Sequence, residues 1–370
     1  HQVAADGVPQ DAVDAALHQL ELSKREITGD GFPYGLHLLM EALTPMIHGG
    51  DPIPALDGDP LLEQLRVESR EPDFIPRLAQ QLLIDNPHRV RLTMAPDVEL
   101  SAKQAATEQQ RLATLRATLD EADQARIIAQ TQALAKRQQQ QDDPELLPKV
   151  GLEDVPVDLK IAEGVSCPVG TVPATWYAQG TNGMVYLQAI LDLPALEADE
   201  LDLLPLFCAC LSEIGSAGRD YRATQARQAA VTGGISASAN VRGGVDDVYQ
   251  VKGILTLGGK ALARNHTALA DLLWETLTSA RFDERARLRE LIAQMRAHRE
   301  EAITEHGHML ALAAASASLS PVAALNHRWD GLQGLKHLKA LDDALDDTEV
   351  LATFADRLEQ LRDRLQQAPR

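Results

Sequence analysis

Cysteine and aromatic residues are scarce in this sequence of 370 residues, which contains three cysteines and 4% aromatics. Cys167, Cys208 and Cys210 are too few for a disulfide framework and show no CxxC spacing. We therefore expect buried thiols in the cytoplasm or in another reducing compartment. Leucine, alanine, valine and isoleucine must supply most of the hydrophobic core.

Long apolar runs and an excess of positive charge are also missing. The most apolar stretch, residues 309–319, is rich in alanine and far too short to span a bilayer, so we expect no membrane partner. A net charge of −19 argues against nucleic acid as a partner. The sequence also lacks a GxSxG elbow, a P-loop and a GxGxxG loop before a helix. No signal peptide is visible at His1, and we expect the chain to be a fragment of a longer protein.

The first 96 residues combine helical periodicity with one strand pattern. Apolar residues recur every three or four positions and predict helices over residues 11–27, 34–47, 61–68 and 74–84. Val90, Leu92 and Met94 alternate with polar residues and predict a strand over residues 88–94. His48 and His88 lie among turn residues, so a capping or surface position explains them better than metal binding.

Residues 97–157 have a different composition, dominated by Ala, Gln, Glu, Arg and Leu, with neither Gly nor Pro between residues 100 and 141. Two narrow leucine and isoleucine stripes flank an acidic break at residues 120–123, which predicts two antiparallel helices. The polar tract 138–156 contains prolines and predicts an extended connector.

Residues 158–370 predict an α+β domain. Alternating patterns predict strands over residues 158–165, 232–241 and 248–257, and a hairpin that joins 174–179 to 184–193. Gly243-Gly244 lies between two strands and opens no helix, so a hairpin turn is favoured over phosphate binding. Helical periodicity marks residues 201–214, 222–231, 265–279, 282–318 as one long helix, 322–330, 331–341 and 348–365.

The order of hairpin, helix 201–214, Gly215-Ser216 and Tyr221 resembles the start of a domain in the pitrilysin/insulinase family of zinc metallopeptidases. A catalytic domain of that family carries HxxEH on this helix, with two His ligands and a Glu that activates water. Aligned on Gly215-Ser216, none of the five motif positions is His or Glu; they are Leu206, Phe207, Cys208, Ala209 and Cys210. The resemblance thus implies no catalytic residue and no metal ligand in this chain, and it assigns no substrate-binding residue.

Three further tracts resemble the presequence protease branch of this family: HGGDP at 48–52, NPHRVRLTMAPD at 86–97, and the helical pair with its connector. This resemblance implies the C-terminal part of a pitrilysin-like second domain (1–96), a helical hairpin linker (97–157) and a pitrilysin-like third domain without HxxEH (158–370). Such a domain has an antiparallel sheet with helices on one face.

The same resemblance implies a parent enzyme, a zinc metalloendopeptidase that degrades short unstructured peptides in a closed chamber. The zinc would lie in the N-terminal catalytic half, the expected partner of this chain, and the chain alone would need no cofactor. The acidic surface then either maintains solubility or attracts basic peptides. We also expect self-association through residues 1–96, because a partial domain leaves apolar faces uncovered.

Two alternatives stay open. The same fold without zinc serves as a structural subunit of assemblies, although the hairpin linker and HGGDP favour the peptidase branch. A metal site could also use His298 and Glu301, which form HxxE on the predicted long helix and share a face with Glu305. Ala302 stands where the second His belongs, so this set is a near miss.

Overall fold

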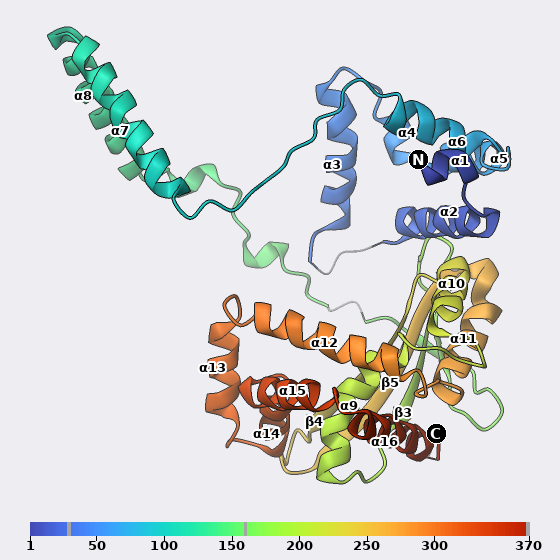
Figure 1. The fold of residues 1–370 in the computed structure, drawn as a ribbon. Helices are drawn as coiled ribbons and strands as arrows, with labels where there is room; N and C mark the ends of the chain where they lie inside the picture. Colours follow the sequence, from blue (N-terminus) through green and yellow to red (C-terminus); the bar gives the residue numbers. More distant parts are fainter. Residues whose placement is uncertain (28–30, 159–160, 368–370) are drawn as a thin grey trace. The chain divides into compact units, whose positions relative to one another are not determined.

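The computed structural model describes residues 1–27, 31–158 and 161–367, and its contacts divide the chain into two compact units. Residues 1–85 and 164–370 form the first unit, and residues 86–163 form the second. Figure 1 shows the helices and strands of both. The predicted domain boundaries at 96 and 157 remain predictions, and positions 159–160 of the predicted first strand lie outside the described residues.

Helices make up the N-terminal part of the first unit, as the periodicity predicted. Pro residues at the first turns of α4 and α5 fit these starts because their backbone needs no helical hydrogen bond there. The elements are α1 (Gln2–Asp6), α2 (Gln10–Arg25), α3 (Tyr34–Ile47), α4 (Ile53–Leu56), α5 (Asp59–Glu68), α6 (Phe74–Ala79) and the π-helix η1 (Gln80–Ile84).

The strand predicted over residues 88–94 is wrong. These residues belong to the second unit and have no regular secondary structure. Val90, Leu92 and Met94 are 91%, 79% and 86% exposed. A strand is stable only when a neighbouring strand satisfies its backbone groups, and none of the described strands pairs with this segment.

The second unit contains the predicted helical pair, α7 (Leu100–Thr118) and α8 (Glu121–Gln139), joined by Leu119 and Asp120 as a hairpin (Figure 1). Asp120 caps α8, since its carboxylate accepts a hydrogen bond from the Asp123 backbone at 2.7 Å. Neither helix contains a buried residue. Two 3₁₀ turns, η2 (Pro144–Leu146) and η3 (Leu152–Asp154), follow in the connector.

A three-stranded antiparallel sheet organises the rest of the first unit, with strand order β3 (Met184–Asp192), β5 (Val251–Leu262), β4 (Ile235–Gly243). The hairpin between β4 and β5 is confirmed. The hairpin predicted before α9 is wrong, because β2 (Thr175–Tyr177) pairs with β1 (Gly164–Ser166). β3 instead pairs with β5 over nine residues, which satisfies far more of its backbone than a three-residue strand could.

Helices cover one face of this sheet, so the predicted α+β fold is confirmed. Leu255, Leu257 and Ala261 of β5 are buried in the core against them, and α9 lies alongside β4 (Figure 1). The helices are α9 (Ala198–Leu211), α10 (Tyr221–Val231), α11 (His266–Thr278) after the 3₁₀ turn η4 (Ala263–Asn265), α12 (Arg285–Glu301), α13 (Gly307–Ser316), α14 (Pro321–Trp329), α15 (Leu332–Ala344) and α16 (Thr348–Gln366).

The single long helix predicted over residues 282–318 is wrong, because it is divided into α12 and α13. The break covers residues 302–306, followed directly by Gly307. β-Branched and glycine residues are poor helix formers, and Ile303, Thr304 and Gly307 come close together here. The apolar periodicity on either side resembled one helix because a short interruption hardly changes the pattern.

Candidate functional site

The five HxxEH-equivalent positions lie on the C-terminal half of α9. The helix begins where the Glu200 carboxylate accepts a hydrogen bond from the Glu197 backbone at 2.8 Å, and Asp199 and Glu200 favour its positive end. Phe207 and Cys210 are 0% exposed and Cys208 is 5% exposed, whereas Leu206 is half-buried against the core and Ala209 is exposed. The core therefore occupies most of this motif.

The side chains at these positions are unsuited to zinc. Phe207 packs on Phe282, with ring centroids 5.6 Å apart. Burial raises the pKa of the Cys208 and Cys210 thiols to about 12, so both remain protonated near neutral pH, whereas zinc binds the thiolate. Leu206 and Cys210, one turn apart on the helix, offer a hydrocarbon and a thiol where a zinc helix presents two imidazoles. The residues present do not fit the metal.

The near miss on α12 also fails to form a site. His298 and Glu301 lie in the last turn of α12, but Glu305 follows the break, so the helix face that the sequence predicted for the three does not exist. All three side chains are exposed. Among the described residues, no group of three His, Cys, Asp or Glu side chains could hold a metal ion. His48 follows the last residue of α3 at its C-cap, and His88 lies in the irregular segment; both are exposed.

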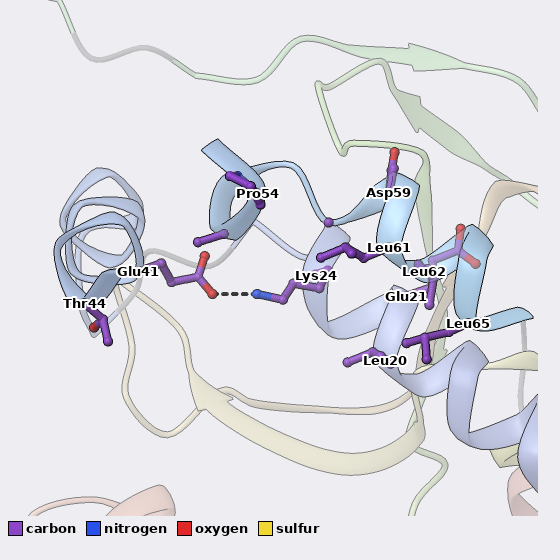
Figure 2. Close-up of a pocket in the computed structure, with 12 residues that line it drawn as sticks. Leu20, Glu21, Lys24, Glu41, Thr44, Pro54, Asp59, Leu61, Leu62 and Leu65 are labelled. Carbon is purple, nitrogen blue, oxygen red and sulfur yellow. Dashed lines mark hydrogen bonds and ion pairs between the residues drawn. The ribbon is translucent and has the colours of Figure 1, made fainter. Parts of the chain in front are cut away.

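An apolar groove of about 500 Å³ lies between α2, α3, α4 and α5 (Figure 2). Its lining is mainly leucine, and Lys24 Nζ and Glu41 Oε1, 2.7 Å apart, join α2 to α3 across it. α3 has no buried residue; its exposed apolar side chains are Leu36, Leu39, Met40, Leu43, Met46 and Ile47. Such a continuous apolar face is typical of a surface that another protein segment covers.

A buried carboxylate joins the N-terminal helices to the sheet. Glu21 of α2 is 2% exposed and accepts hydrogen bonds from Arg25, from Arg66 of α5 and from Arg264 after β5. These contacts, above all that with Arg264, lower the pKa of Glu21 from 4.5 to about 2. Nearby, Gln19 Nε2 donates to the Thr232 carbonyl at 2.7 Å. We call Glu21 and its three arginines the Glu21 cluster.

Sequence reasoning missed both the groove and the Glu21 cluster. The available signal for the cluster was a glutamate between Leu20 and Leu22 on an amphipathic helix, which alone predicts an exposed charge. Nothing in the sequence pairs Glu21 with Arg264, which lies 243 residues away.

Comparison with known proteins agrees with the architecture. The model of the family described as associated with peptidases of family M-16, subfamily C, matches residues 94–341. The mitochondrial presequence protease of Danio rerio is 28% identical over 350 residues, which cover 94% of this chain and 34% of that protein. Presequence protease 1, chloroplastic/mitochondrial, of Arabidopsis thaliana is 28% identical over 358 residues, which cover 94% of this chain and 32% of the relative.

A mammalian relative gives the same picture. The mitochondrial presequence protease of Mus musculus is 26% identical over 355 residues, with 95% of this chain and 34% of that protein covered. The chain thus spans about a third of the length of the relatives it matches. In the part of the chain that the structure describes, no helix is long and apolar enough to cross a membrane. The chain belongs to this peptidase-associated family, in its presequence protease branch.

Proposed function

We propose that this chain is the non-catalytic segment of a zinc metalloendopeptidase of the presequence protease type. In this proposal the segment forms part of the wall of a chamber that admits short unstructured peptides, while the zinc and the activated water belong to the catalytic half. The observation that carries it is the family match over residues 94–341 together with an α9 whose motif positions are filled by core side chains.

The wall role follows from the chemistry of α9. A helix that held zinc would need to expose imidazole and carboxylate groups to substrate. Here Phe207 and Cys210 are fully buried and stabilise the domain instead. Replacing Phe207 with a small residue would cost about 3–5 kcal/mol of folding free energy, a magnitude typical of a core position.

The apolar groove and the face of α3 provide the contact with the catalytic half in this proposal. About two thirds of each relative lies outside the region that the chain matches, and the groove offers leucine side chains rather than polar groups. A partner segment with an apolar surface would therefore bind there through hydrophobic burial.

The test begins with the chain alone. We expect no stoichiometric zinc after dialysis and no hydrolysis of a quenched fluorescent peptide, because the described part of the chain, α9 included, has no ligand set. The catalytic half, produced from the same gene as a separate protein, should bind this chain and recover chelator-sensitive hydrolysis. One tightly bound zinc per isolated chain, or chelator-sensitive hydrolysis by it, would contradict the proposal.

A pair of matched variants tests the contact surface. Leu39 and Leu312 are 58% and 60% exposed, on α3 and on α13. Leu39→Glu should weaken binding of the catalytic half at least about tenfold, because burying an unpaired carboxylate is costly, whereas Leu312→Glu should leave it unchanged. Equal effects of the two variants would refute the assignment of the groove and α3 as the contact.

A further inference from the structure

A second cavity lies on the helical side of the core, remote from the groove between α2 and α5. It has a volume of about 240 Å³ and is lined by residues of α9, α12, α14, α15 and α16. Leu203, Leu338 and Trp329 form apolar walls and are 7%, 4% and 8% exposed. The Trp329 indole donates to the Leu201 carbonyl at 2.8 Å, which holds this wall in place.

Three guanidinium groups also line the cavity. Arg328 Nη2 lies 2.5 Å from Asp202 Oδ2, and Arg357 Nη2 lies 2.8 Å from Asp199 Oδ2. Arg299 Nη1 donates to the Trp329 carbonyl at 2.6 Å. A guanidinium carries five N–H donors, and these contacts use only one or two nitrogens of each group. The cavity therefore combines oriented, charged donors with an apolar wall.

The charges of the lining are unequal. Three arginines and two aspartates line the cavity together with His337, so with a neutral His337 the lining carries one net positive charge. Each aspartate already has an arginine partner. The partner of Arg299, Asp330, is not part of the lining and is 74% exposed. The complementary ligand is a monoanion.

We propose that this cavity binds a single carboxylate attached to a short apolar group, such as the C-terminal leucine of a peptide or a short aliphatic acid. The carboxylate accepts hydrogen bonds from the guanidiniums of Arg299 and Arg357, a geometry that arginine favours. The apolar group packs on Leu203, Leu338 and Trp329. The volume is below the roughly 300 Å³ of sites for drug-sized ligands, which limits the ligand to a few carbons. This inference does not depend on the proposed function.

The test uses Trp329 as a reporter in the full chain. The protein contains three tryptophans, so its indole N–H region of a ¹H–¹⁵N spectrum is simple. Trp176 and Trp274 are 56% and 53% exposed, and Trp176→Phe and Trp274→Phe assign their signals, leaving that of Trp329. We expect N-acetyl-leucine to shift the Trp329 signal saturably and the other two signals not at all.

Probes and variants separate the contributions to binding. N-acetyl-leucinamide, which lacks the charge, and acetate, which lacks the apolar group, should bind at least about fivefold more weakly. Hexanoate distinguishes an aliphatic acid from a peptide end, and the tighter of hexanoate and N-acetyl-leucine identifies the ligand source. Arg357→Gln should weaken binding several-fold and Arg357→Lys should recover part of it. Arg281→Gln removes a guanidinium that pairs with Asp283 and does not line the cavity, so it should have no effect.

Three results would overturn the proposal. The first is no saturable Trp329 shift with either carboxylate up to about 10 mM, a weak affinity that a specific site of this kind should exceed. The second is equal binding of N-acetyl-leucine and its amide. The third is an equal effect of Arg357→Gln and Arg281→Gln.

Discussion

The Glu21 cluster makes a sharp prediction about how the N-terminal helices stay attached to the sheet. Glu21→Gln keeps the size of the side chain but removes the negative charge that three arginines surround. Arg25, Arg66 and Arg264 then repel one another with no charge to balance them. We expect α2 to detach from the sheet more often, because breaking a buried ion pair costs more than the pair contributes on folding.

The magnitude follows from the pKa of Glu21. A fall from 4.5 to about 2 corresponds to about 3 kcal/mol in favour of the folded state at neutral pH. The three arginines are 28%, 31% and 55% exposed, so solvent screens part of this energy and we expect about 2–3 kcal/mol. Because the folded pKa is depressed, this stability is present above a pH of about 4.5 and is lost as the pH falls toward about 2.

Hydrogen exchange of the α2 amides measures this effect where it occurs. Glu21→Gln should speed exchange in α2 about 30- to 150-fold near pH 7, and much less near pH 3, where the wild-type carboxylate has lost about two thirds of its advantage. The control is Glu359→Gln, which removes an exposed partner of Arg362 and should change exchange less than about threefold. The reasoning fails if both variants behave alike, or if the effect of Glu21→Gln does not shrink with falling pH.

Other features of the chain lead to three further expectations. Of the three thiols only Cys167 should react quickly with a disulfide reagent in the folded protein, because burial raises the pKa of Cys208 and Cys210 to about 12; three fast thiols before unfolding would contradict this. Limited proteolysis should cut first within residues 138–154, where Val150 and Leu152 are 83% and 90% exposed, whereas a first cut in the β4–β5 hairpin would argue against the unit boundaries. The isolated chain should self-associate through residues 1–96, as seen by light scattering, while Leu39→Glu should reduce this association; a clean monomer at high concentration would refute it.

Several elements could be predicted from the sequence because their causes are local. α3 and α10 begin and end within one residue of the predicted bounds, since turn residues flank an apolar stripe of helical period. The β4–β5 hairpin was predictable for the same reason, with a glycine turn between two alternating segments. The inert character of α9 also follows from residue types, because leucine, phenylalanine and alanine offer no metal ligand at any position.

Features that depend on distant residues were decided by the tertiary structure. Both β2 and β3 have strand patterns, but the backbone of β3 found its partner in β5, beyond α9 and α10. The segment 88–94 also alternates, yet it forms no strand, because alternation describes side chains and a strand requires another backbone. Glu21 and Arg264, or Asp199 and Arg357, are ordinary surface charges in a linear sequence. Only packing of the helices brings each pair together, removes water around them and turns them into a buried cluster and a lined cavity.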